Sequence, residues 1–141
     1  MKRLNWLGVV LGLVISEVIG MAWYGALFAE KWVAEVHPNL DPKANDVMPM
    51  IAGAVDVLVM IVALGWLIAQ LGWNSLAGGA RAGLIAAIGL TAPGVILDPI
   101  YAGRSLHLMA IEAGYVTVAL VISGALIGAV RLPAKKAAAV T

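Results

Sequence analysis

The sequence contains no cysteine, which excludes disulfide bonds, thiolate metal ligands and cysteine nucleophiles. It has only two histidines, His37 and His107, which are too few for a typical imidazole-rich metal site. Its serines, histidines and acids form no recognisable nucleophilic arrangement. The pair Gly78-Gly79 lacks the following lysine and hydroxyl residue of a phosphate-binding loop. We therefore predict that the protein is not an enzyme and needs no cofactor.

Charged residues are also scarce, at 12% of the chain compared with about 25% in soluble domains. The net charge is +1, so no strong field favours nucleic acid, and we predict no nucleic-acid partner. Apolar residues reach 62%, above the roughly 45–50% of soluble domains. These proportions predict that the apolar residues face a lipid bilayer as well as one another.

Four segments are long enough to cross a membrane, which takes about 20 mostly apolar residues. The predicted spans are residues 4–28, 47–73, 80–101 and 105–130. Lys2 and Arg3 precede the first span as they would a signal peptide, but its run exceeds the roughly 7–15 apolar residues of such a leader. We expect this helix to be retained. Residues 1–141 are predicted to form one all-α transmembrane domain.

The connections between the predicted spans differ in length. Residues 29–46 form the long loop, with a short amphipathic piece around Trp32 that the prolines after His37 bring to an end. Asp46 is the predicted N-cap of the second span. Residues 74–79 and 102–104 form short connections. Short connections join antiparallel neighbours, so we predict an antiparallel up-down four-helix bundle.

The distribution of Lys and Arg predicts the orientation in the membrane, because cytoplasmic loops carry more of them. With the N-terminus inside, the inner side holds Lys2, Arg3, Arg81, Arg131, Lys135 and Lys136, and the outer side holds Lys31, Lys43 and Arg104. This bias predicts that both termini are cytoplasmic and that loop 29–46 lies outside.

Small residues recur every four positions in two of the spans. The first span carries Gly8, Gly12, Ser16 and Gly20, and the fourth carries Gly124 and Gly128. Such stripes let membrane helices approach closely, because lipid tails supply no hydrophobic drive for association. They serve either neighbouring helices within one bundle or a homodimer, and the sequence leaves both open.

Each predicted span contains one acid: Glu17, Asp56, Asp98 and Glu112. A charge at mid-bilayer costs about 2.5–3.5 kcal/mol on insertion scales, so each acid is a candidate functional residue. Tyr24 lies seven residues after Glu17 and shares its helix face, and Tyr115 lies three after Glu112. We expect these side chains to face the bundle interior and to meet in its outer half.

Only Arg104 and His107 are placed to compensate the four acids. Arg104 could pair with Asp98 across the short hairpin, and His107 with Glu112, whereas Glu17 and Asp56 have no evident basic partner. The acids are protonated and structural, or they bind a proton or cation, or they lie at solvent-exposed positions. The candidate binding residues are Glu17, Asp56, Asp98, Glu112, Tyr24, Tyr115, Arg104 and His107; a metal ligand cannot be assigned.

The third span is interrupted by Pro93-Gly94 and by Pro99. Proline removes a backbone donor, so carbonyls near Gly89 and Val95 lose their usual partners. Freed carbonyls beside Asp98 are what a cation or water site uses in transporters. The other explanation is a plain proline kink, which is tolerated wherever the backbone is buried in protein.

The first and last spans carry recognisable motifs. Asn5-Trp6 is followed by Gly20-x-x-Trp23-Tyr24-x-x-Leu27-Phe28-x-x-x-Trp32, and the fourth span carries Ile111-Glu112-Ala113-Gly114-Tyr115 and Gly124-Ala125-x-x-Gly128. The chain resembles the small bacterial membrane proteins of domain of unknown function family 1761. It departs from their pattern at Ala29, where glycine commonly follows the phenylalanine, and Glu17 is not a residue typical of the family.

This resemblance implies four membrane helices in a bacterial membrane, and no activity or catalytic residue. We predict the cytoplasmic (inner) membrane as the location. Together with the acids it leads to two functional hypotheses. The first is a membrane protein that binds or translocates a proton, cation or small cationic solute through its acidic cluster. The second is a structural or accessory membrane protein that docks with itself or a partner through the small-residue faces.

Overall fold

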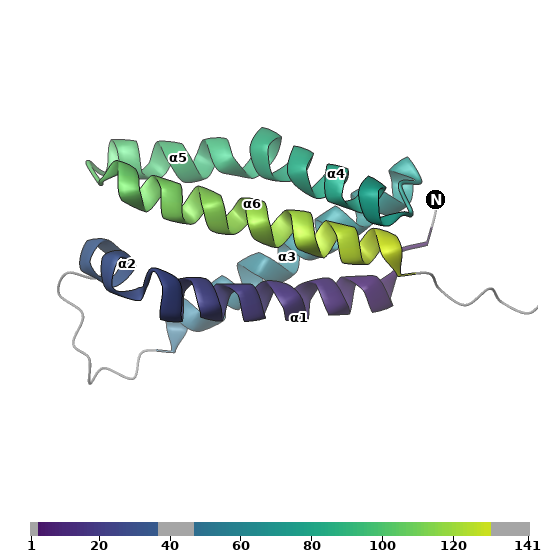
Figure 1. Ribbon diagram of the computed structural model, residues 1–141, viewed down its shortest axis with the longest axis horizontal. Coiled ribbons are helices and arrows are strands. Elements are labelled where there is room, and N and C mark those ends of the chain that lie inside the picture. Colours follow the sequence, from purple (N-terminus) through teal and green to yellow (C-terminus); the bar gives the residue numbers. More distant parts are fainter. Residues whose placement is uncertain (1–2, 37–46, 131–141) are drawn as a thin grey trace, which may run out of the picture.

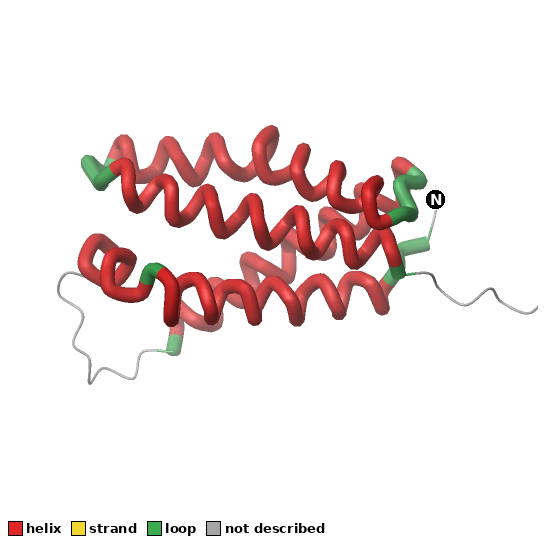
Figure 2. The backbone as a smooth tube through the Cα atoms, viewed as in Figure 1, coloured by secondary structure: helices red, strands yellow, loops and turns green. Residues whose placement is uncertain are grey.

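The computed structural model describes residues 3–36 and 47–130, and within these ranges it is almost entirely helical (Figures 1 and 2). Within each of these two ranges the helices are joined by short turns. In chain order the elements are α1 (Trp6–Ala22), the π-helical turn η1 (Trp23–Leu27), α2 (Ala29–Val36), α3 (Met48–Leu71), α4 (Leu76–Ala86), the π-helical turn η2 (Ala87–Thr91), α5 (Ala92–Tyr101) and α6 (Leu106–Ala129).

Four continuous helical segments are long and apolar enough to cross a membrane, as the sequence predicts. They are Trp6–Leu27, Met48–Leu71, Leu76–Tyr101 and Leu106–Ala129. The third begins earlier than the predicted Ala80, because Ser75 caps it by accepting a hydrogen bond from the Gly78 N–H at 3.0 Å. The helix before it ends at Gly72, whose φ of 71° is left-handed and suits glycine.

The predicted N-cap at Asp46 is wrong. The N-cap of α3 is Val47, which makes no side-chain hydrogen bond, and a proline in the first turn fixes a helical φ instead. Asp46 itself lies outside the described residues, as do His37, Lys2, Lys43, Arg131, Lys135 and Lys136.

Helix α6 occupies the centre of the bundle. Figure 1 shows it between the α4–α5 segment and α1, with α3 crossing behind, and it contacts each of these elements. Its Leu120 and Ile127 are 2% exposed, and Ile61 and Ile68 of α3 are 1% exposed. The apolar core therefore lies between α6 and the second half of α3.

The approach of α4 to α6 depends on glycine. A Cβ on Gly79 would collide with the backbone oxygen of Gly124, one on Gly83 with the backbone oxygen of Leu120, and one on Gly128 with that of Ser75. The two helices touch backbone to backbone, which is the contact that small residues permit in membrane proteins.

The small-residue stripe of α1 faces α6 as well. A Cβ on Gly8 would lie 3.0 Å from Ile127 Cα, and one on Gly20 would lie 3.3 Å from the Tyr115 hydroxyl. Between them Ser16, which is fully buried, shares a hydrogen bond of 2.8 Å with Ser123. Both stripes are thus occupied within one chain, and a homodimer would need another surface.

Candidate intramembrane binding site

The two halves of α3 have different surroundings. Every residue from Met48 to Asp56 is exposed, whereas Val57, Ile61 and Leu64 further along are buried. Figure 1 shows why: α3 crosses the other helices obliquely, so that its first half stands away from them. A cavity of about 540 Å³ lies between this half, α1, η1, α2 and α6.

The cavity brings together three of the four predicted acids. Glu17 comes from α1, Asp56 from α3 and Glu112 from α6. Three aromatic side chains, Tyr24, Trp32 and Tyr115, line it too, and its other lining residues are apolar. We call this site the acidic cavity. None of the described residues that line it is Lys or Arg.

Glu17 is the least satisfied of these acids. Its Oε1 atom is buried and accepts no hydrogen bond from any described residue. Buried polar atoms are nearly always hydrogen-bonded, so an orphaned carboxylate oxygen requires an explanation. Asp56, by contrast, is exposed, and Glu112 is partly buried with a hydrogen bond from the Trp32 side chain.

The aromatic side chains form a continuous wall. The ring centroid of Tyr24 lies 5.0 Å from that of Tyr115 and 5.1 Å from that of Trp32, both in tilted arrangements. The Tyr115 hydroxyl donates to the Ser16 carbonyl at 3.5 Å. Gly20 leaves room for this tyrosine, because a Cβ there would press on its hydroxyl. Two members of the wall therefore belong to the segment from η1 to α2, and the third to α6.

The π-helical turn η1 positions Tyr24, and the sequence did not predict it. Trp23 turns toward α6 and donates from its indole Nε1 to the Ile111 carbonyl at 2.9 Å, while the next residue, Tyr24, lines the cavity. Single π turns inside α-helices occur frequently at functional sites.

Asp98, Arg104 and His107 lie outside the acidic cavity, and all three are exposed. The expected pairs Asp98–Arg104 and Glu112–His107 do not form within the part of the chain that the structure describes. Arg104 Nη1 donates instead to the Glu35 carbonyl at 3.4 Å, and both Ser105 N–H (3.2 Å) and Ser105 Oγ donate to the Glu35 carboxylate. Sequence analysis missed this role of Glu35, which is 70 residues from Ser105.

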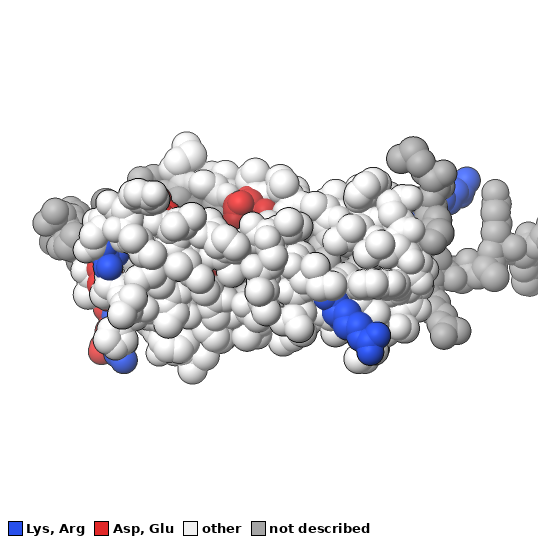
Figure 3. Space-filling view, turned by 90° about the horizontal axis from the view of Figure 1, so that it is seen from above, with Lys and Arg blue, Asp and Glu red and all other residues white. Residues whose placement is uncertain are grey.

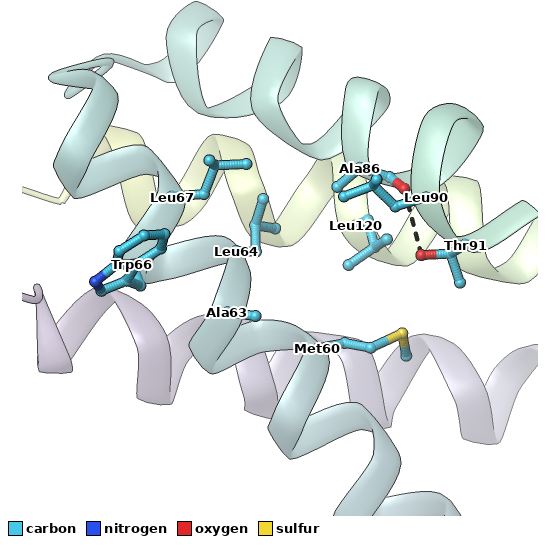
Figure 4. Close-up of a pocket in the computed structure, with 9 residues that line it drawn as sticks. All are labelled: Met60, Ala63, Leu64, Trp66, Leu67, Ala86, Leu90, Thr91 and Leu120. Carbon is cyan, nitrogen blue, oxygen red and sulfur yellow. Dashed lines mark hydrogen bonds between the residues drawn. The ribbon is translucent and has the colours of Figure 1, made fainter.

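The interruption of the third span takes the form of η2, just before Pro93. The hydroxyl of Thr91 donates to the Ala86 carbonyl at 3.3 Å, the bond drawn in Figure 4. A second cavity of about 280 Å³ lies here, between η2, α3 and α6. Its lining is apolar except for Thr91 and the Trp66 indole N–H, and no acid reaches it (Figure 4). The irregular backbone and Asp98 therefore do not share a cavity.

Comparison with known protein families agrees with the resemblance seen in the sequence motifs. The model of the family described as protein of unknown function (DUF1761) matches residues 7–128. The chain belongs to the DUF1761 family. The match includes all three acids of the acidic cavity. Neither a curated protein nor a solved structure matches the chain significantly.

Proposed function

We propose that this DUF1761 protein binds a proton, a cation or a small cationic solute in the acidic cavity, within the bacterial cytoplasmic membrane. The observation that carries the proposal is the gathering of Glu17, Asp56 and Glu112 from three helices around one cavity without a lining Lys or Arg. Uncompensated acids are costly inside a membrane. A bound cation offsets that cost and gives the orphaned Glu17 oxygen a partner.

The surface supports the membrane location. Figure 3 shows a face that is white over most of its area, with red and blue confined to a few separate places: a group at the left end, a red patch nearer the middle and blue side chains further right. Many large apolar side chains on all four spans are exposed, among them Leu11, Val59, Leu90 and Ile122. A surface of this kind suits lipid rather than water.

The proposed topology is an antiparallel up-down bundle with both termini in the cytoplasm, and the acidic cavity lies in its outer half. The Lys and Arg bias supports this orientation. Single cysteines at Asn39 and Lys136 test it, since the natural chain has no cysteine to give a background. Both positions lie outside the described residues. Labels should reach them from opposite sides of the membrane, and labelling from one side contradicts the topology.

Melting temperatures with and without cations test the binding function. A ligand at 100 times its dissociation constant stabilises the folded state by about 2.7 kcal/mol. We would compare the parent with Glu17→Gln, Asp56→Asn and Glu112→Gln across pH and with added cations. Glu30→Gln is the matched control, because this exposed acid lies outside the cavity. The melting temperature of the parent and of the control should shift with pH or with added cations, and this shift should be lost in the three cavity variants.

Overlapping curves for the parent and all three cavity variants would overturn cation binding. The accessory hypothesis would then remain. One observation favours it: the first half of α3 is exposed along its whole length and offers an unoccupied helix face. A partner that docks there would protect this segment, and only this segment, from hydrogen exchange.

A further inference from the structure

The dimensions of the acidic cavity indicate the size of its ligand. Its volume of about 540 Å³ falls in the range of roughly 300–1,000 Å³ that is typical of small-molecule sites. An inorganic cation needs several ligands within about 2.0–2.6 Å of a single point. Among residues 3–36 and 47–130, no group of three His, Asp or Glu side chains is placed to hold a metal ion. The three acids surround a space rather than converge on a point.

The lining indicates the chemistry of the ligand. Tyr24, Trp32 and Tyr115 line the cavity, and aromatic rings attract a cation within about 6 Å of their centroids. Met21, Met50 and Val57 supply apolar surface on the same cavity. Carboxylates, an aromatic wall and apolar residues together suit an organic cation with a hydrocarbon portion.

The opening of the cavity indicates how the ligand enters. Met21 is 67% exposed and Met50 is 75% exposed, so both stand at its rim. Gly25 of η1 and Gly53 of α3 also line the cavity, and a Cβ on either would meet nothing within 4 Å, so both elements border open space there. We take this opening to face lipid, because the exposed side chains at its rim, Met21 and Met50, are apolar. A lipophilic cation dissolves in that environment, whereas a hydrated metal ion does not.

We propose that the acidic cavity binds a small lipophilic organic cation of the quaternary-ammonium type, which enters from the bilayer between η1 and the first half of α3. This inference rests on the proposed cation-binding function and narrows it to a ligand class. The orphaned Glu17 oxygen supplies negative charge to the ammonium, and Tyr24 and Trp32 supply ring faces. The apolar groove of Figure 4 lacks acids and is not the site for this ligand.

Calorimetric titration of the purified full chain in lipid nanodiscs tests the ligand class. The probe is benzyltrimethylammonium, and its neutral comparison is neopentylbenzene, which has the same shape with carbon in place of nitrogen. We expect the ammonium to bind at least about tenfold more tightly than the neutral compound, as befits a charge-assisted contact. Sodium and potassium ions at equal ionic strength should not displace it.

Substitutions test the residues. Glu17→Gln should weaken ammonium binding about tenfold or more. Trp32→Leu should weaken ammonium binding about 3- to 30-fold. Trp32→Phe keeps an aromatic ring at this position and should retain most of the parent's affinity. Trp66→Leu and Glu30→Gln are matched controls outside the cavity and should bind like the parent. If Glu17→Gln does not fold, Asp56→Asn replaces it, because Asp56 is exposed.

The outcomes separate this inference from the function on which it rests. If protons or alkali-metal ions shift the melting temperature of the parent but not of the cavity variants, and the ammonium does not bind, the ligand class is wrong and cation binding stands. If no cation, organic or inorganic, has an effect that the cavity variants abolish, both the cation-binding function and the ligand class are wrong. If the neutral compound binds as tightly as the ammonium, the cavity is merely apolar and the organic-cation inference is overturned.

Discussion

The α4–α6 contact and the first half of α3 are opposite cases of helix packing in one small bundle. At the first, Gly79 and Gly83 bring the backbone of α4 into direct contact with that of α6. At the second, every residue from Met48 to Asp56 is exposed and the acidic cavity lies alongside. Because lipid tails solvate apolar side chains as well as protein does, close packing needs small residues. The comparison teaches that this bundle combines a tightly packed α4–α6 contact with an open cavity beside the first half of α3.

The largest effect is expected at the α4–α6 contact. Gly79→Ala adds a methyl group where the Gly124 backbone already lies, so the helices must separate. Overpacking typically costs about 1–3 kcal/mol, and backbone contact puts this site at about 3 kcal/mol or more. Thermal unfolding in detergent, followed by circular dichroism, measures the loss.

Gly12→Ala is the matched control for that variant. Its added Cβ would meet side-chain atoms of Ile127 and Ile61 at 3.2–3.3 Å, and side chains can move by a few tenths of an ångström. The expected cost is below about 1 kcal/mol. Equal stability of the two variants would show that α4 and α6 do not touch through their backbones.

The α1–α6 contact is intermediate, because two buried hydroxyls join the helices there. Ser123 donates to the Gly12 carbonyl at 2.9 Å and shares a hydrogen bond with Ser16. Ser123→Ala should cost about 1–3 kcal/mol, since it leaves the Ser16 hydroxyl without this partner. Combining it with Ser16→Ala should cost less than the sum of the two, with a coupling of about 0.5–1.5 kcal/mol. Strict additivity in this double-mutant cycle would contradict the shared hydrogen bond.

A smaller effect is expected where α2 joins the α5–α6 turn, beside the acidic cavity. Glu35 of α2 accepts hydrogen bonds from Ser105, the N-cap residue of α6. Helix α2 also carries Trp32, which lines the acidic cavity. Glu35→Ala should cost about 1 kcal/mol, as loss of a helix cap does. Amide hydrogen exchange in α2 should also become faster. Lys31→Ala, an exposed change on the same helix, is the control, and identical exchange in both variants would contradict the anchoring role.

Hydropathy alone predicted the four membrane helices, because each span is one long apolar run. Their ends depend on local caps. Helix α4 begins at Leu76 and not at the predicted Ala80, because Ser75 accepts a hydrogen bond from the Gly78 N–H. Hydropathy does not detect such a cap. The two π turns were also missed, since an extra residue within a helical turn leaves no clear periodic signal in a single sequence.

The candidate site was predictable only where one helix determines it. The seven-residue spacing placed Glu17 and Tyr24 on one face, and both line the acidic cavity. Which acids of the other helices join them depends on the crossing of α3 and the position of α5, which are set by contacts between distant segments. Asp98 was therefore grouped with the other acids although it lies outside, and Trp32 was not assigned to the site although it lines it.

The smallest effect is expected in the first half of α3, at Gly53→Ala. A Cβ there would meet nothing within 4 Å, so the change adds no clash. Alanine also loses less conformational freedom than glycine on forming a helix, so we expect a stabilisation of about 0.5–1 kcal/mol. Gly53→Ala and Gly79→Ala are the same chemical change in a helix, yet we expect the first to raise the stability and the second to lower it. This makes them the most discriminating pair of variants. Destabilisation by Gly53→Ala in the same thermal unfolding assay would mean that the first half of α3 packs against the bundle and closes the cavity.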